Sequence, residues 1–376
     1  MRPLSLLVCA VALTAAAQPP SPKLTGGTGT IYLASYGRRI VAIDEATEKV
    51  AGEIPLKVGL PWSVRIARDG SRFYVQSADQ EHFEVIDVAN RQTLDTFTLS
   101  EGNKKVRALA FDVDPANRIM MLVARTVTKL SDRFEIGTPV FIQYDLKEHR
   151  VVQTIPWATD PEPQYYYLSV RYSPDGKLLY AFSNEIIAYD ATTLKQLDSW
   201  NLSLPNEPGL GRFDLNAMDD VNDEPGFFTG LFAMEDAVQK RRLLGVGRVD
   251  LQQKKLDYFP IGPSPDRGDV SFAMTPDRKR GYMMIEEIGH HEMWTIDITR
   301  KRLESRAEFQ GRPRMAVRTS SNGKLIYLYE AGNTIDLYDP AGFKYLRTIT
   351  LPEDMMYGTF YVVPPRLARP ATTPRP

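Results

Sequence analysis

Cysteine and histidine are scarce in this chain of 376 residues, which contains one cysteine and four histidines. The single cysteine, Cys9, lies in an apolar segment near the N-terminus. The sequence therefore has no internal disulfide, no CxxC redox pair and no thiolate metal site. A chain of this length does not need disulfides, because it buries enough apolar surface to fold without them.

The chain also lacks an excess of charge of either sign. Its formal net charge at pH 7 is −1, with 46 basic and 47 acidic residues. Such a balance gives no general attraction to nucleic acid or to an anionic membrane surface. Hydrophobic residues make up 43% of the sequence and charged residues 25%, which is typical of a folded protein with a large core.

Long apolar runs are missing after the first residues. Met1-Arg2-Pro3 is a basic start, residues 4–16 are almost entirely apolar, and Ala15-Ala16-Ala17 is a small-residue cleavage site. This run is shorter than the ~20 residues of a membrane span. We predict that residues 1–17 are a secretory signal peptide, with an uncleaved anchor as the alternative. The mature protein is then periplasmic or secreted, without a membrane span.

Internal repetition is the strongest signal in the rest of the chain. The clearest unit, residues 63–99, holds four short β-rich runs at 63–67, 73–76, 83–87 and 94–99. Turn residues such as Asp69-Gly70 separate these runs. The same first-strand and turn pattern recurs at 170–180 and 317–327, and residues 272–277 are a weaker copy without the glycine.

The third run of each unit ends in aspartate, and the spacing of these aspartates gives the repeat length along the chain. The seven residues are Asp44, Asp87, Asp145, Asp190, Asp250, Asp297 and Asp339. Most intervals are about 42–47 residues, as expected for a four-stranded propeller blade, and two are about 58 and 60 residues. The long intervals predict insertions in the third and fifth repeats. We interpret each Asp as a turn residue whose carboxylate accepts backbone N–H groups.

The two ends of the repeat region predict how the ring closes. The first repeat begins at Ile31-Tyr32-Leu33, which is a second strand, and one extra strand, residues 358–363, follows the seventh repeat. That strand can complete the first blade and remove the open edges. We therefore predict an all-β, seven-bladed β-propeller of four-stranded blades over residues 30–363. Residues 18–29 are a linker, and residues 364–376 are a disordered proline-rich tail.

Three stretches carry a resemblance to a known group. They are Arg133-Phe134-Glu135 before the strand at 140–145, the fourth repeat with its Ser173-Pro174-Asp175-Gly176-Lys177 turn, and the enlarged fifth repeat. In repeat order and insertion placement, residues 30–363 resemble the YVTN-type bacterial propellers. Within that group they are most similar to the β subunits of quinohemoprotein amine dehydrogenases.

This resemblance implies a periplasmic propeller with no cofactor of its own. In that family the β subunit supports a small quinone-bearing subunit, and a third subunit carries haem. The chain has no CxxCH haem attachment motif. We therefore predict a non-catalytic binding or scaffold protein, either a subunit of a dehydrogenase complex or a stand-alone relative bound to another protein. The alternative is a lactonase-like metal hydrolase that uses the channel mouth.

Arginines on the first strands are the main candidate ligand-binding residues. Arg65, Arg171 and Arg318 each lie four residues before the turn Asp or Asn of their repeat. First strands line the channel of a propeller, so these side chains predict a basic throat that binds an anion or an acidic group of a partner. The alternative is a set of structural ion pairs with residues such as Asp69 or Asp269. Two further arginines near strand starts, Arg107 and Arg314, are candidates for the same site.

Tyr165-Tyr166-Tyr167 is a candidate partner surface, because clustered tyrosine is enriched at interfaces, with packing over the loop as the alternative. His290-His291-Glu292 is the only His cluster, but adjacent side chains on a strand point to opposite faces and suit one metal poorly. We expect no metal site there and no catalytic residue elsewhere.

The acidic run 219–224 does not fit a calcium loop, because Pro225 stands where glycine is needed, and we expect a solvated insertion. Trp62, Trp157, Trp200 and Trp294 are interpreted as core or hairpin aromatics.

Overall fold

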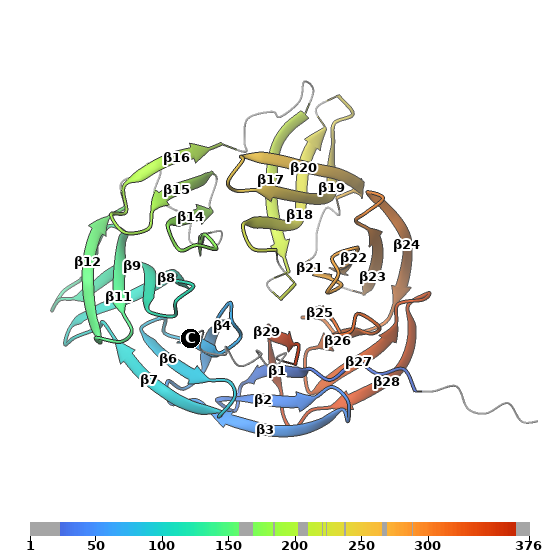
Figure 1. Ribbon diagram of the computed structural model, residues 1–376, viewed down its shortest axis with the longest axis horizontal. Helices are drawn as coiled ribbons and strands as arrows, with labels where there is room; N and C mark the ends of the chain where they lie inside the picture. The colour runs from blue at the N-terminus through green and yellow to red at the C-terminus, as the bar shows by residue number, and fades with distance from the viewer. Residues whose placement is uncertain are drawn as a thin grey trace, which may run out of the picture.

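The computed structural model describes residues 23–157, 168–182, 185–201, 210–219, 221–222, 224–236, 238–264, 269–287 and 289–365. These residues form strands and no helix, so none of them belongs to a helix that could cross a membrane. Seven antiparallel sheets surround a central axis like the blades of a propeller (Figure 1). The predicted seven-bladed, all-β architecture is confirmed.

Each blade is a meander whose first strand lies nearest the axis, except that the first blade takes its innermost strand from the C-terminus (Figure 1). The first blade contains β29 (Met355–Val363), β1 (Thr30–Ser35), β2 (Arg39–Asp44) and β3 (Lys49–Pro55). The second contains β4 (Pro61–Ile66), β5 (Arg72–Ser77), β6 (His82–Asp87) and β7 (Gln92–Thr98). The third contains β8 (Lys104–Val113), β9 (Ile119–Lys129), β10 (Phe134–Ile136), β11 (Val140–Asp145) and β12 (Arg150–Pro156).

The remaining blades follow in sequence order. The fourth contains β13 (Ser169–Tyr172), β14 (Leu178–Phe182), β15 (Ile186–Asp190) and β16 (Gln196–Trp200). The fifth contains β17 (Leu210–Met218), β18 (Phe227–Asp236), β19 (Arg241–Asp250) and β20 (Lys255–Pro263). The sixth contains β21 (Asp269–Met274), β22 (Arg280–Glu287), β23 (His290–Asp297) and β24 (Arg302–Phe309). The seventh contains β25 (Ala316–Thr319), β26 (Ile326–Glu330), β27 (Thr334–Asp339) and β28 (Lys344–Thr350).

The hydrophobic core is divided among the blade interfaces. The described residues form seven buried clusters, and each cluster joins two neighbouring blades. The cluster between the first and second blades, for example, packs Tyr32 against Phe73 with ring centroids 5.0 Å apart. A single blade cannot bury both of its faces, so the ring is stable only when every interface is filled.

The C-terminal strand closes the ring as predicted. In the register of β29 with β1, Ile31 lies opposite Val362 and Leu33 opposite Phe360. Side chains of the seventh and first blades reinforce this pairing. Arg318 Nε donates to the carbonyl of Phe360 over 2.8 Å, and the buried Glu45 accepts the Tyr327 hydroxyl over 2.9 Å. Both backbone and side-chain hydrogen bonds therefore hold the ring closed.

The two ends of the ring differ in which connections they carry. We call one end the Asp face; it holds the turns between first and second strands and between third and fourth strands, such as 67–71 and 88–91. We call the other end the ribbon face; it holds the turns between second and third strands and the connections between blades. Both enlarged blades lengthen toward the ribbon face, where β10 pairs with the distal half of β9. Both also project beyond the outline of the other blades (Figure 1).

The turn aspartates do what the sequence pattern predicts. In all seven blades the carboxylate at the end of the third strand accepts a backbone N–H two or three residues later, as Asp44 does from Thr47 over 2.7 Å. The Thr47 hydroxyl and N–H hold the pKa of Asp44 below its ordinary value. These residues fix the outer hairpins of the Asp face.

Candidate functional site

The first strands bring one equivalent residue from each blade to the channel. The turn bond from Gly70 N–H to the Ala67 carbonyl, 2.7 Å, recurs in the third, fourth, sixth and seventh blades. The residues two positions before these carbonyls are therefore equivalent: Arg65, Asp112, Arg171, Ala273 and Arg318. In the first blade Tyr361 takes this place, because it pairs with Tyr32 as Arg65 pairs with Tyr74.

Carboxylates share this ring with the arginines. Asp112 Oδ2 accepts the backbone N–H of Tyr172 over 2.8 Å, and Asp219 Oδ2 accepts that of Met274 over 2.7 Å. Because Tyr172 and Met274 are equivalent residues of the fourth and sixth blades, Asp219 is the counterpart of Asp112 in the fifth blade. The ring therefore alternates Arg65, Asp112, Arg171 and Asp219 from the second to the fifth blade. The sequence pattern predicts the basic members of this ring and does not reveal the acidic ones.

Arg65 and Arg171 line one cavity at the Asp face, with a volume of about 180 Å³. Asp112 and Arg68 line it too, and Ile66, Val362 and Val363 give it an apolar wall. Among the described residues, the guanidinium of Arg65 contacts only the ring of Phe111, whose centroid is 5.5 Å away. Cation–π contact leaves the positive charge of an arginine unneutralised.

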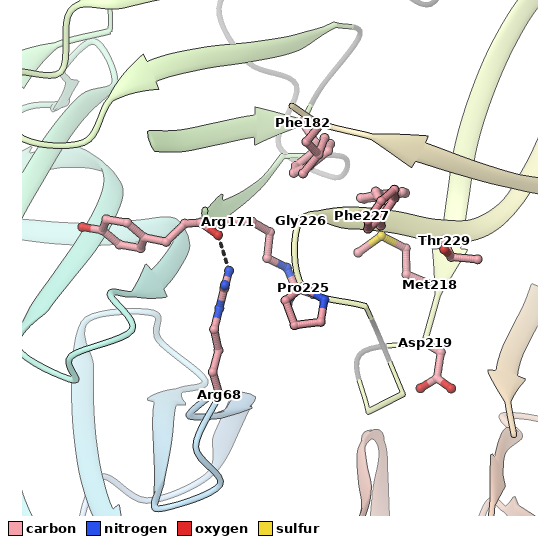
Figure 2. A pocket seen from close by; sticks show the side chains of 12 residues that line it. Arg68, Arg171, Phe182, Met218, Asp219, Pro225, Gly226, Phe227 and Thr229 are labelled. Carbon is pink, nitrogen blue, oxygen red and sulfur yellow. Dashed lines mark hydrogen bonds between the residues drawn. The ribbon is translucent and has the colours of Figure 1, made fainter. Parts of the chain in front are cut away.

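Arg68 crosses the channel mouth between two blades. It extends from the β4–β5 turn of the second blade and donates a hydrogen bond to the carbonyl of Tyr172 in the fourth. Figure 2 shows this bond beside Arg171 and the Pro225-Gly226 turn, where Arg68 and Arg171 also line a smaller pocket. The repeat pattern does not mark Arg68, because the residue lies in a turn after the first strand.

Arg318 is placed differently from the other two arginines. Its guanidinium donates to the carbonyls of Phe360 and Val317, and it lines a second channel cavity of about 170 Å³. Arg314 lines the same cavity, and its backbone N–H donates to Glu286 over 2.6 Å. The three predicted arginines thus divide between two cavities, and Arg318 also ties the closing strand to the seventh blade.

Arg107 lies on the ribbon face and lines neither channel cavity. It is half exposed on the ribbon of β8 and β9, with Nε 3.6 Å from an oxygen of Glu81. The difference from Arg65 has a simple geometric cause. Arg65 stands near the end of its strand and Arg107 near the start, and the two ends of a first strand are at opposite faces of the ring.

Asp219, the first residue of the acidic run after β17, is not solvated as expected from sequence. Asp219 is 1% exposed, and its carboxylate accepts the backbone N–H groups of Val221, Asn222 and Met274. Glu224 forms an ion pair with Arg248, N–O 2.7 Å. Asp220 and Asp223 lie outside the described residues. The run forms the turn between β17 and β18, and hydrogen bonds of Asp219 and Asn222 with the backbone of Met274 tie this turn to the sixth blade.

The side chains of His290 and His291 point to opposite faces of their strand, as expected. His291 is 4% exposed against Phe309 of the blade interface, whereas His290 faces a cavity of about 220 Å³. His290 Nε2 lies 2.7 Å from Glu292 Oε1, and this hydrogen bond raises the pKa of His290. In the part of the chain that the structure describes, no three His, Cys, Asp or Glu side chains gather around one metal position.

Large apolar side chains are exposed in two places, on the outer strands and on the ribbon face. Six of them, among the described residues, lie on outer fourth strands: Val50, Leu94, Val151, Val152, Leu197 and Tyr345. The other five lie on the ribbon face: Tyr36, Trp62, Phe134, Ile136 and Val238. The interpretation of Trp62 as a core or hairpin aromatic is wrong, because its side chain is 59% exposed at the start of β4. Residues 165–167, the predicted tyrosine surface, lie outside the described residues.

Comparisons with known proteins identify the fold and no family. No protein-family model matches the chain, and no curated protein matches its sequence. Among solved structures, Kuenenia stuttgartiensis hydrazine synthase is 15% identical, with a TM-score of 0.50 over 85% of this chain and 96% of that one. A functionally unknown protein from Desulfotomaculum acetoxidans DSM 771 is 14% identical, with a TM-score of 0.51 over 90% and 100%.

A third solved structure, the dihydro-heme d1 dehydrogenase NirN in complex with DHE, is 15% identical, with a TM-score of 0.49 over 91% of this chain and 77% of that one. Identities this low carry the fold alone. The chain is a seven-bladed β-propeller with structural neighbours of very different sequence.

Proposed function

We propose that the protein is an exported, non-catalytic binding propeller that holds a partner protein on its ribbon face. The observation that carries this proposal is the distribution of exposed apolar side chains. Tyr36, Trp62, Phe134 and Ile136 come from the first three blades and lie on one face, away from the outer strands. Exposed aromatic side chains are the residues that most often anchor protein–protein contacts.

The charge beside this apolar surface indicates the chemistry of the partner. Basic residues on the β8–β10 ribbon outnumber acidic ones, even when Glu81 of the second blade, which pairs with Lys105 and Arg107, is counted: Lys104, Lys105, Arg107, Arg125, Lys129 and Arg133 against Glu81, Glu101, Asp132 and Glu135. An acidic rim on the partner complements this excess and accelerates association at low salt. A partner with an apolar centre and an acidic rim is therefore the best fit.

The similarity of the repeats to amine dehydrogenase β subunits refines the proposal. On that basis the partner is a small quinone-bearing chain, and a haem-carrying chain completes the complex. Export rests on the signal-like residues 1–17, which lie outside the described residues. The mature chain is then expected to begin at Gln18 in the periplasmic or secreted fraction, as N-terminal sequencing of the native protein would show.

Co-purification from the native host tests the partner surface. Wild type and the double variant Trp62→Ser/Ile136→Ser are compared with the matched control Leu94→Ser/Val152→Ser, which removes exposed apolar side chains from outer strands. We expect one partner in stoichiometric amount with wild type and control, and its loss from the ribbon-face variant. Redox staining for quinone and a haem spectrum test the finer assignment. A native protein that migrates as a monomer, or a partner retained by Trp62→Ser/Ile136→Ser, contradicts the proposal.

A further inference from the structure

The cavity at the Asp face is separate from the proposed partner surface and has its own chemistry. Arg65, Arg68 and Arg171 line it, and Asp112 is the only carboxylate among the described residues that do so. Arg65 and Arg68 supply two guanidinium groups against the one carboxylate of Asp112, which is an excess of positive charge among these three residues. A guanidinium binds a carboxylate through two parallel N–H···O bonds, which makes arginine a preferred residue for recognising organic acids.

Arg65 and Arg68 can each bind a ligand in addition to the contacts that they already make. Among the described residues, Arg65 has no ion pair and contacts only the Phe111 ring, and Arg68 donates to a neutral carbonyl. Partners of this kind leave the charge of both groups uncompensated. Arg68 is exposed and Arg65 is partly buried. The charge of Arg65 therefore gains more from a counter-ion, because Coulomb attraction is larger where the effective dielectric constant is lower.

Asp112 adds a negatively charged hydrogen-bond acceptor beside the arginines. Its Oδ2 accepts the N–H of Tyr172, and among the described residues its Oδ1 has no hydrogen-bond donor. No ion pair joins Asp112 to Arg65 or Arg68 in the described part of the chain. A carboxylate oxygen beside the arginines suits a ligand that carries both an acidic group and a hydroxyl or ammonium donor.

The apolar wall and the volume of the cavity limit the size and polarity of the rest of the ligand. Ile66, Val362 and Val363 form an apolar wall, and the cavity volume is about 180 Å³, far above the ~10–15 Å³ that one water molecule needs. An inorganic anion would leave this wall without a contact. A small organic acid with a short apolar side chain fills the same space and makes use of each kind of lining residue.

We propose that the Asp-face cavity binds a small carboxylic acid that also carries a hydroxyl or ammonium group, a 2-hydroxy acid or an amino acid. Arg65 holds the carboxylate together with Arg68, and Asp112 accepts the hydrogen bond from the second group. The apolar side chain of the ligand packs on Ile66 and Val362. Binding does not require the ribbon-face partner, so the free chain is competent.

Isothermal titration calorimetry with four matched probes tests this site on the purified mature chain. The probes are 2-hydroxyisovalerate, valine, isovalerate and isobutylamine, which share a branched carbon skeleton and differ in the two polar groups. We expect 2-hydroxyisovalerate or valine to bind about tenfold more tightly than isovalerate, and isobutylamine not to bind. The two best probes separate a hydroxy-acid site from an amino-acid site. Absence of binding by all four at 10-fold excess over ~1 mM protein overturns the proposal.

Variants test which residues recognise the ligand. Arg65→Gln is expected to weaken binding about tenfold or more, and Arg65→Lys to restore part of it. Arg300→Gln is the matched control, since Arg300 lies on the same face in an outer turn with its side chain 69% exposed. Asp112→Asn is expected to abolish the preference over isovalerate. Equal affinity of wild type and Arg65→Gln, with unchanged circular dichroism, excludes the assigned role.

Discussion

At the Asp face the connections repeat from blade to blade, whereas at the ribbon face they differ in length and chemistry. Seven turn aspartates make the same type of bond, and the first turn of five blades closes with the same N–H to carbonyl contact. The ribbon face instead carries β10, the long strands of the fifth blade and the exposed Trp62. The regular face carries the bonds that repeat around the ring, whereas the irregular face is the one on which we propose that a partner binds.

The largest expected difference between the faces concerns stability. Asp219→Ala leaves the buried N–H group of Met274 and the partly buried N–H groups of Val221 and Asn222 without an acceptor, and should lower the free energy of unfolding by about 3 kcal/mol. Trp62→Ser on the ribbon face should change it by less than about 0.5 kcal/mol, because the side chain is mostly exposed. Urea denaturation monitored by circular dichroism measures both. Equal losses of unfolding free energy in the two variants would contradict this difference between the faces.

A second prediction uses pH to test the closure at the Asp face. Burial raises the pKa of Glu48, but hydrogen bonds from Arg347 and Lys23 outweigh it, so the pKa lies below the ordinary 4.5. The folded form therefore binds the proton less well than the unfolded form, and this ion pair stabilises the ring above about pH 4.5 and loses its effect as the pH falls. The urea midpoint of Glu48→Gln should accordingly change less between pH 6 and pH 3.5 than that of wild type.

Parallel pH profiles of Glu48→Gln and wild type would show instead that this contact adds nothing to closure. Glu53→Gln is the matched control, because Glu53 pairs with Arg39 away from the Asp face. Its profile should follow wild type more closely than that of Glu48→Gln does.

The smallest expected effect concerns the repeated turns themselves. Gly70 has φ 65°, and no atom lies within 4 Å of a Cβ added there, so Gly70→Ala isolates the cost of the left-handed backbone. We expect a loss of about 1 kcal/mol in the free energy of unfolding. Gly59→Ala is a comparison on the ribbon face with φ 84° and equally open space. A stabilised Gly70→Ala protein would mean that the turn relaxes and that regularity at this face is not enforced locally.

Features that recur in every blade could be predicted from the sequence. The spacing of the aspartates gave the blade number, and the incomplete first repeat gave the pairing of residues 358–363 with the strand after Thr30. Both predictions depend on local chemistry, since turns need particular residues and an open sheet edge needs a partner.

Features set by contacts between blades could not be predicted. Asp112 and Asp219 occupy positions equivalent to Arg65, but register shifts in β17 hide the alignment of the fifth blade. Trp62 is a large aromatic residue of the kind that usually packs in a core, yet it is exposed at the start of β4. Whether a side chain is covered depends on contacts between blades, which a local sequence pattern does not show.

Site-specific photo-crosslinking in the native host tests the division between the faces most directly. A photoreactive phenylalanine analogue is placed at Trp62 or Ile136 on the ribbon face, and at Gln253 or Lys324 on the Asp face. We expect one discrete crosslinked protein from both ribbon-face positions and none from the Asp-face positions. Crosslinking to a protein from Gln253 or Lys324 alone, or from none of the four positions, would contradict it.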